Sequence, residues 1–214
     1  SYRIEVLRDV DGYCYEIEFL PALSYLAPYR PVSAWNFRKN YHGDLFQFEA
    51  QLKRRLQFAI FPHMIAHEYP ICQQPPDKRA ADFLEIYAPL FSTLLGKEQV
   101  LLPHCVTATG ANDVNLYVNG DGNYVVPITS RVQFLSRRIP TTETVAVSLR
   151  VQDGAALNWA HVYSADGPVY RASLKQDRSE ARVEITHHGS ASVLVVGKGP
   201  EPALEEADTQ RIDR

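Results

Sequence analysis

The periodicity of apolar residues changes near residue 98 of this 214-residue chain. Before that point, apolar positions recur at helical intervals between short apolar runs that prolines interrupt. After it, apolar and polar positions alternate as far as residue 199. Alternation with a period of two is typical of half-buried strands, whereas a period near 3.6 indicates amphipathic helices. The pattern predicts an α/β segment over residues 1–97, followed by an all-β domain over residues 98–199.

The first segment is predicted to contain short strands and two helices. The strands are expected over residues 13–20, 32–37 and 58–61. One helix, over residues 44–57, starts at the N-cap candidate Asp44, with Gln47 at the capping-box distance. The other follows Pro75, and Pro89 is expected to kink or end it. Strands that alternate with helices favour β-α units with parallel pairing.

Charged residues of the first helix are expected on its exposed side. Lys53, Arg54 and Arg55 are interpreted as a solvated face, and Glu49 forms an exposed i,i+4 pair with Lys53. The apolar residues that repeat on the opposite face are Leu45, Phe48, Leu52 and Leu56. A helix with this pattern is predicted to pack one face against a core.

The second segment is predicted to be an antiparallel β-sandwich of the jelly-roll or Greek-key type. Its strands are expected over residues 100–108, 114–118, 123–128, 132–135, 144–151, 157–164, 169–174, 181–186 and 191–196. Turn sequences lie between several of them, such as Asn119-Gly-Asp-Gly122. Residues 200–214 are rich in Pro, Glu and Asp and are predicted to form a flexible tail. The expected fold class is α+β and multidomain, with a partial, barrel-like α/β segment before the sandwich.

Composition narrows the class of protein. The chain is 45% hydrophobic and 22% charged with a formal net charge of -3, values that are ordinary for globular proteins. Lys and Arg do not gather into an electrostatic footprint for nucleic acid, and no apolar run is long enough to span a membrane. The three cysteines are far apart and odd in number, which favours buried thiols in a reducing, cytoplasmic compartment.

The order of elements across residues 10–199 resembles the carboxyl-terminal part of a glycoside hydrolase, in which the last β-α units of a TIM barrel precede a β-sandwich. The ending Val183-Glu-Ile-Thr-His-His-Gly-Ser-Ala-Ser-Val-Leu-Val-Val196 is similar to the endings of amylase-like and galactosidase-like enzymes. The resemblance implies hydrolysis of O-glycosyl bonds by this chain or by a longer enzyme, a carbohydrate partner, and neither a cofactor nor a metal. A sheet of these few strands would have exposed edges, so an upstream domain or self-association is expected.

Glu68 is the candidate catalytic carboxylate. It lies in the polar stretch after the predicted strand 58–61, and the carboxyl ends of parallel strands are where chemistry gathers in such folds. Glycosidic cleavage needs two carboxyl groups, one protonated and one ionised. Asp44 is the second candidate, and Glu16 and Glu18 remain alternatives to it.

Aromatic, amide and imidazole side chains near the same strand ends are candidates for sugar binding. An aromatic ring stacks on the apolar face of a pyranose, and amides bond its hydroxyls. The candidates are Trp35, Asn36, Tyr41, His42, His63 and His67. Ordinary loop and core packing is the alternative for all of them. A small metal-dependent enzyme that uses His63, His67 and Glu68 is a further alternative, although the spacing lacks the HExxH order.

The second segment carries other residues with two interpretations. Trp159, His161 and Tyr163 share one face of a predicted strand. They form either the strip of a non-catalytic glycan- or protein-binding module or a packing surface for the first segment. Asn and Asp residues around Asn119 suit either turns or a calcium ion. His187, with the histidine that follows it, precedes a glycine turn and is expected at the surface.

Overall fold

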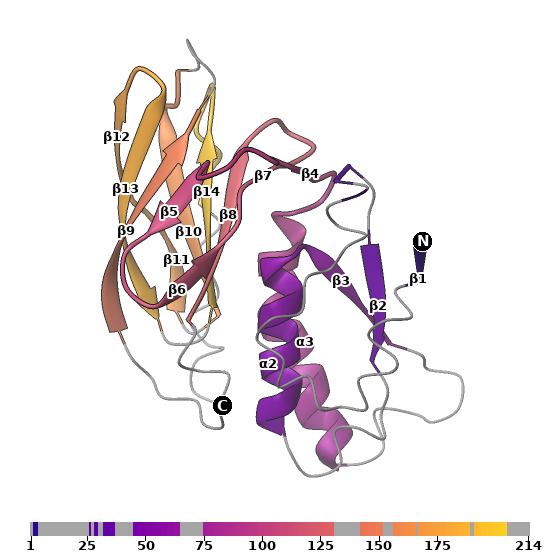
Figure 1. Ribbon diagram of the computed structural model, residues 1–214. Helices are drawn as coiled ribbons and strands as arrows, with labels where there is room; N and C mark the ends of the chain where they lie inside the picture. Colours follow the sequence, from indigo (N-terminus) through magenta and orange to yellow (C-terminus); the bar gives the residue numbers. More distant parts are fainter. Residues whose placement is uncertain are drawn as a thin grey trace.

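The computed structural model describes residues 2–3, 26, 28–29, 32–36, 45–64, 75–130, 142–151, 156–165, 167–188 and 191–204. Within these residues, one half of the molecule holds a parallel sheet with two helices, and the other half holds two antiparallel sheets (Figure 1). The protein is therefore a β-rich α+β protein. In the described part of the chain, no helix is long and apolar enough to cross a membrane.

In the parallel sheet, the spatial order of the three strands is their order along the chain. Its strands are β1 (Tyr2–Arg3), β2 (Val32–Asn36) and β3 (Ile60–Met64). Helix α2 (Leu45–Gln57) connects β2 to β3, and helix α3 (Pro75–Ser92) follows β3. The predicted parallel pairing of the second and third strands is confirmed. The predicted strand over residues 13–20 lies outside the described residues.

Helix α3 does not end at Pro89. The proline ring removes one hydrogen-bond donor from the helix interior, yet the helix continues to Ser92. Ser92 Oγ then donates to Pro89 O at 2.6 Å, and Thr93 Oγ1 donates to Leu90 O at 2.7 Å. These hydroxyls bond carbonyls that a helix end leaves without intrahelical partners.

The two antiparallel sheets differ in size. The larger has the order β11 (Gly167–Arg171), β10 (Trp159–Ser164), β14 (Ala191–Gly197), β8 (Tyr124–Ser130), β7 (Tyr117–Val118), β4 (Glu98–Gln99), with β6 (Asn112–Val114) also paired to β8. The smaller has the order β12 (Ser173–Asp177), β13 (Glu180–His188), β9 (Thr142–Arg150), β5 (Val106–Ala108). Their inward-facing apolar residues, among them Ile128, Val147 and Val183, form one core between the sheets.

Three predicted strands are corrected by the structure. Residues 114–118 do not form one strand, because β6 ends at Val114 and β7 begins at Tyr117, and both pair with β8. Residues 169–174 do not form one strand, because β11 pairs with β10 in the larger sheet whereas β12 pairs with β13 in the smaller one. The chain changes sheets at Ala172, whose N–H donates to Ala160 O at 2.9 Å. Of the predicted strand 100–108, only Val106–Ala108 forms a strand. Residues 132–135 lie outside the described residues.

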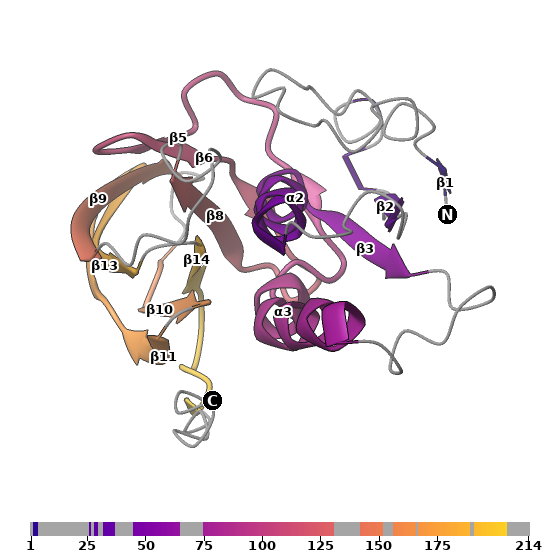
Figure 2. The same ribbon diagram turned by 90° about the horizontal axis from the view of Figure 1, so that it is seen from below.

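The outer face of the larger sheet packs on the two helices. Leu52 and Leu56 of α2, Tyr87 and Leu90 of α3, and Leu94 just after α3 are 0–1% exposed and share a second core with residues of the sheet. The sheet residues in this core include Tyr117, Val125, Trp159, Val193 and Val195. Figure 2 shows both helices on this side of β8 and β14. Strands β8 and β14 are buried at all seven positions because both faces of the sheet are covered.

Three charged residues of α2, Glu49, Lys53 and Arg55, are buried and Arg54 is half-buried, so the prediction of a solvated face is wrong. Lys53 and Glu49 are each 2% exposed, and Arg55 is 5% exposed. The helix contacts α3, β3 and β8. Tyr87 of α3 donates a hydrogen bond to Glu49 Oε1 at 3.1 Å, which places this carboxylate in the interface between the helices.

The carboxyl end of α2 is bound to the larger sheet through Gln57. Its main-chain oxygen accepts bonds from Asn115 Nδ2 at 2.8 Å and Tyr117 Oη at 2.9 Å. The side-chain amide is oriented by its partners, with its oxygen accepting from Val114 N at 3.1 Å and its nitrogen donating to Thr129 Oγ1 at 3.1 Å. Gln57 is 2% exposed, so these bonds compensate for the loss of water.

Removing side-chain volume from the helix–sheet core is expected to destabilise the protein. Leu90 is 1% exposed, and Leu90→Ala should lower the free energy of unfolding by about 2–5 kcal/mol. Leu95 lies just beyond the same helix and is 61% exposed, so Leu95→Ala should change the free energy of unfolding by less than about 0.5 kcal/mol. Urea unfolding of the two variants measures both values. Equal effects would contradict the core position of Leu90.

Candidate functional site

The carboxyl ends of β2 and β3 bring two predicted substrate-binding positions together. In the parallel register, Trp35 is the Cα partner of His63, and Asn36 is the partner of Met64. The sequence separates Trp35 from His63 by a complete helix, and the pairing of β2 with β3 makes their backbones neighbours. These positions are therefore adjacent in the backbone near the carboxyl ends of the two strands.

The other candidates at these strand ends lie outside the described residues. They are the carboxylates Glu68 and Asp44, their alternatives Glu16 and Glu18, and the side chains Tyr41, His42 and His67. The catalytic pair therefore stays a prediction from the sequence. So does the metal alternative, which depends on His67 and Glu68.

The row of Trp159, His161 and Tyr163 on β10 packs inside the protein. Trp159 is 7% exposed and His161 is 1% exposed, and the Trp159 ring belongs to the helix–sheet core. Their ring centroids are 4.8 Å apart. Of the two sequence interpretations, packing against the first segment is the one that fits, because a ring this buried offers no flat surface to a sugar.

Trp159 lies directly over the backbone of the neighbouring strand. A Cβ atom at Gly197 would be 1.9 Å from Trp159 Cζ2, so only glycine leaves room for the indole. Gly197 and Trp159 are Cα partners in the pairing of β10 with β14. The strand pairing thus fixes the indole, and the imidazole of His161 beside it, in one position.

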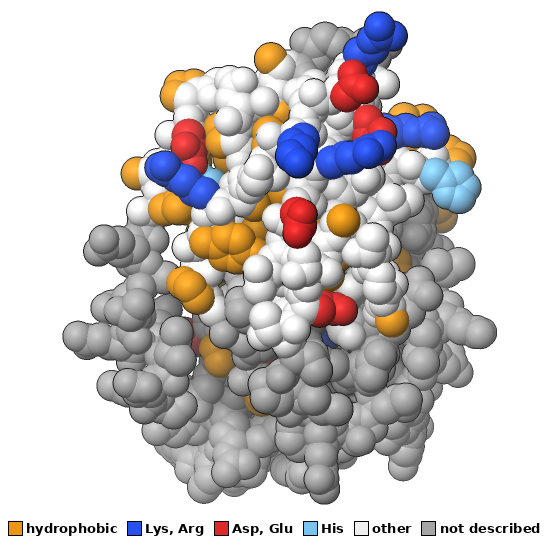
Figure 3. Space-filling view, turned by 90° about the vertical axis from the view of Figure 1, so that its left-hand side faces the viewer, with side chains coloured by type: hydrophobic (Ala, Val, Ile, Leu, Met, Phe, Trp, Pro, Cys, Tyr) orange, Lys and Arg blue, Asp and Glu red, His pale blue; other side chains and the backbone are white. Residues whose placement is uncertain are grey.

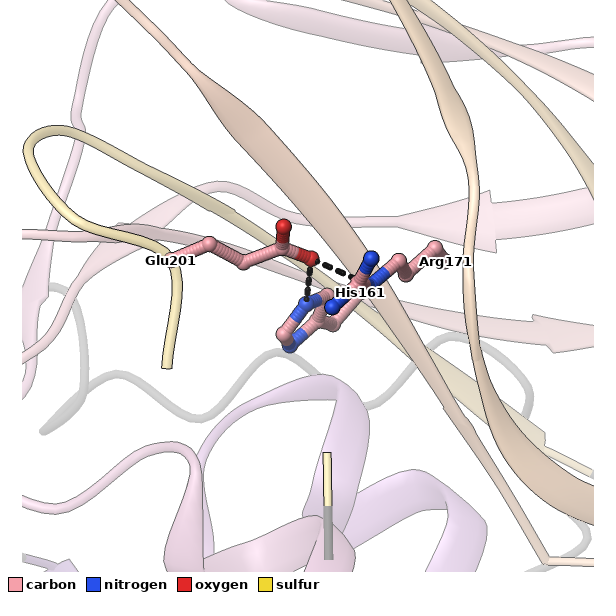
Figure 4. Close-up of polar contacts among 3 residues, drawn as sticks. All are labelled: His161, Arg171 and Glu201. Atoms are coloured by element: carbon pink, nitrogen blue, oxygen red, sulfur yellow. Dashed lines mark hydrogen bonds and ion pairs between the residues drawn. The ribbon is translucent and has the colours of Figure 1, made fainter. Parts of the chain in front are cut away.

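His161, Arg171 and Glu201 form a polar cluster at the edge of the larger sheet (Figure 4). Glu201 Oε1 lies 2.6 Å from His161 Nε2 and 2.8 Å from Arg171 Nε. A carboxylate only accepts hydrogen bonds, so His161 carries a proton on Nε2 in this arrangement. Glu201 belongs to the segment that the sequence assigns to a tail. Sequence reasoning missed this cluster because 40 positions separate His161 from Glu201.

The cluster has the chemistry of anion recognition. It contains two nitrogen donors and one acceptor, and no hydroxyl or thiol nucleophile is among its members. Charge-assisted bonds from Arg and His to a carboxylate are shorter and stronger than neutral ones. This arrangement can bind and position a carboxylate.

A second histidine contacts serines inside the two-sheet half. His187 is 1% exposed, so its predicted surface position is wrong. Its Nδ1 lies 3.0 Å from Ser192 Oγ, which in turn lies 3.4 Å from Ser164 Oγ. A serine beside a histidine is a possible nucleophile and base. Because Ser192 is 0% exposed, no substrate reaches it in this structure, and the pair satisfies buried polar groups instead.

The Asn119 region forms a turn. Asn119 Oδ1 accepts bonds from Asp121 N and Asn123 N, both at 3.1 Å, which is the arrangement of an Asx turn. Turn formation therefore explains these side chains. Among the residues that the structure describes, no group of three or more His, Cys, Asp or Glu could hold a metal ion.

The outer face of the smaller sheet carries charges of both signs (Figure 3). Arg182 Nη2 lies 3.0 Å from Glu180 Oε2, and this contact lowers the pKa of Glu180 and raises that of Arg182. An exposed pair of this kind contributes little to stability. Glu184 lies on the same strand and is also exposed.

Two buried groups have shifted pKa values. Burial raises the pKa of the Cys105 thiol, which favours the neutral form, and this cysteine is free. The other two cysteines lie outside the described residues. Burial lowers the pKa of the Lys97 amine from 10.5 to about 8. Lys97 is 2% exposed, with Nζ 5.6 Å from the centroid of the Tyr117 ring and 3.5 Å from Pro28 O.

Comparison with known proteins finds distant structural similarity. No protein-family model and no curated protein matches the sequence. The chain is similar to a candidate alpha-galactosidase from Bacteroides fragilis NCTC 9343, with 15% identity and a TM-score of 0.35 over 78% of this chain and 34% of that one. It is also similar to the glycoside hydrolase family 30 subfamily 8 xylanase Xyn30A from Clostridium acetobutylicum, with 9% identity and a TM-score of 0.38 over 84% of this chain and 53% of that one.

The chain spans about a third of the first of these proteins and about half of the second. It thus has a loose resemblance to parts of glycoside hydrolase structures. A resemblance at this level carries no argument about substrate or mechanism.

The free energy of unfolding is expected to rise with pH through Lys97. The amine loses its proton near pH 10.5 in the unfolded chain but near pH 8 in the folded one. Between these values the unfolded state binds more protons, so stability increases as pH rises. Lys97→Met should remove this dependence and raise the free energy of unfolding at neutral pH, because the variant no longer buries a charged amine. Urea unfolding across this range measures both effects, and identical pH slopes for the two proteins would contradict the lowered pKa.

Proposed function

We propose that this chain is the carboxyl-terminal region of a carbohydrate-active enzyme that hydrolyses O-glycosyl bonds. In this proposal, residues 1–97 supply the last β-α units of a barrel-like fold, and residues 98–199 form a supporting β-sandwich of the jelly-roll or Greek-key type. The carboxyl ends of β2 and β3 contribute to the active-site face. The substrate class is carbohydrate.

The observation that carries the proposal is the chain-order, parallel arrangement of β1, β2 and β3, with α2 as the crossover between β2 and β3. Successive β-α units of a barrel have this order, and their chemistry lies at the carboxyl ends of the strands. Trp35 and His63 occupy neighbouring positions in that sheet. In the described residues, no strand pairs with the outer edge of β3, so further strands from an upstream segment or a second copy would extend the sheet.

The proposed catalytic groups are the carboxylates of Glu68 and Asp44. One would protonate the glycosidic oxygen, and the other would act as nucleophile or as base for water. Trp35 would stack on a sugar ring. The polar side chains Asn36, Tyr41, His42, His63 and His67 would bond its hydroxyls.

The proposed role of the two-sheet half is support of the α/β part. Its larger sheet covers both helices and buries leucines and Tyr87 that would otherwise face water. The alternative of a glycan-binding module on β10 has less support, because Trp159 and His161 are buried beneath other elements.

Glu68→Gln is expected to lower the turnover of aryl glycosides by about a hundredfold or more, because the amide can neither transfer a proton nor attack the sugar. Glu184→Gln, at an exposed position on β13, is the matched control and should keep full turnover. A panel of aryl glycosides measures kcat for both variants. Full turnover in Glu68→Gln would exclude Glu68 as a catalytic residue.

Trp35→Ala is expected to weaken oligosaccharide binding about tenfold through the loss of ring stacking. Isothermal titration calorimetry with oligosaccharides measures the dissociation constants of the wild-type protein and the variant. Tyr29→Ala removes another aromatic ring, one that is 64% exposed and precedes the amino end of β2, opposite to the end that holds Trp35, and serves as the control. Equal affinities for Trp35→Ala and the wild type would contradict a sugar subsite at Trp35.

A further inference from the structure

Two nitrogen donors on adjacent strands converge on one oxygen atom at the edge of the larger sheet. His161 of β10 and Arg171 of β11 are Cα partners in the antiparallel pairing, so the sheet sets the separation of their side chains. Figure 4 shows both side chains pointing toward the Glu201 carboxylate. The distances to Oε1 are 2.6 Å from His161 Nε2 and 2.8 Å from Arg171 Nε. The two donors are thus held in place by the fold.

The two donors differ in their access to water. His161 is 1% exposed, and its ring lies 4.8 Å from the Trp159 ring, so the imidazole has little freedom to turn away. The Arg171 side chain is 64% exposed and reaches the same oxygen from the solvent side. A buried, oriented donor combined with a solvent-exposed cation on the adjacent strand is a preorganised receptor for an anion.

The carboxylate that fills this receptor belongs to a mostly exposed segment. Residues 198–203 are exposed, and the segment follows the end of β14. Apart from the contacts of Glu201, the hydrogen bond described for this segment is from Asn158 Nδ2 to Gly199 O, at 3.3 Å. Lys198 Nζ lies 5.7 Å from the centroid of the Tyr124 ring, and Leu204 is half-buried. Glu201 supplies the carboxylate by which the segment reaches His161 and Arg171, and its side chain is 31% exposed.

We propose that His161 and Arg171 form a binding site for carboxylate ligands, which Glu201 occupies from within the same chain. An external carboxylate takes the place of Glu201 when residues 198–204 move away, so the segment acts as a tethered competitor. A short tether gives Glu201 an effective concentration in the millimolar range or above. An external ligand therefore needs a comparable concentration or additional contacts to displace it.

The alternative is that Glu201 only attaches the end of the chain to the sheet. Removal of the carboxylate has different consequences for the two roles. If Glu201 only attaches the chain end, a free anion does not bind after the carboxylate is removed. If His161 and Arg171 form a receptor, a free anion binds between them in place of the carboxylate. Acetate reproduces the carboxylate of Glu201 in size and charge, and acetamide has nearly the same shape without the charge.

The test uses Glu201→Ala in a Trp35→Phe background. Because the chain has two tryptophans, this background leaves Trp159, beside His161, as the sole tryptophan reporter. Acetate is expected to change the Trp159 fluorescence of this variant in a saturable way. Its apparent dissociation constant should be at least tenfold lower than in the Trp35→Phe parent, where Glu201 competes. Acetamide should bind at least tenfold more weakly than acetate.

Two further variants separate the receptor from a general effect of salt. Glu184→Ala removes an exposed carboxylate from the other sheet and should respond to acetate as the parent does. Adding Arg171→Gln to Glu201→Ala should weaken acetate binding at least tenfold, because the cationic donor is lost. Should Glu201→Ala not fold, Glu201→Gln serves the same comparison, since acetate displaces a neutral amide more readily than the native carboxylate.

Equal acetate responses in the parent and in Glu201→Ala would overturn the proposal. So would equal responses to acetate and acetamide, because the site would then not recognise charge. A selective acetate response that persists undiminished after Arg171→Gln would also overturn the assignment of the site to this pair of donors.

Discussion

The packing of α2 on the larger antiparallel sheet is the constraint on which the positions of the other elements depend. Gln57 ends the helix with its main-chain oxygen bound by Asn115 and Tyr117 and its side-chain amide bound within β6 and β8. A buried amide that lacked these partners would be costly, so the helix end and the sheet are stable only in matching positions. The polar contact thereby sets the register between two elements that apolar packing alone would allow to slide.

The position of the parallel sheet follows from that packing. Directly after Gln57 the chain reverses at Ala59, which has a φ of 49°, and it enters β3 at Ile60. A left-handed residue at a helix end is usually glycine, and a fully buried alanine in this conformation carries some strain. Because β2 pairs with β3 and β1 pairs with β2, one helix end orients all three strands and the candidate site at their carboxyl ends.

Burial of the central strands on both faces explains why the solvent-accessible polar cluster described here lies at an edge of the larger sheet. Strands β8 and β14 lie between the inter-sheet core and the helices, and their polar members Thr129 and Ser192 are 0% exposed. At the edge formed by β10 and β11, Arg171 reaches water and Glu201 approaches from a separate segment. Polar groups there can exchange partners without opening a core, which the serine–histidine pair at His187 cannot do.

Local periodicity in the sequence determined the helix over residues 44–57, most of the strands and the division near residue 98, because each depends on which side chains a short segment can bury. It also put Trp35 in one predicted strand and His63 just after another, but the pairing that makes their backbones neighbours came from the tertiary structure. Three features came from the tertiary structure alone. They are the division of the strands between the sheets, the burial of charged residues of α2, and the contact of Glu201 with His161. These outcomes depend on contacts between residues far apart in the chain, whose free energies leave no trace in the pattern of any one segment.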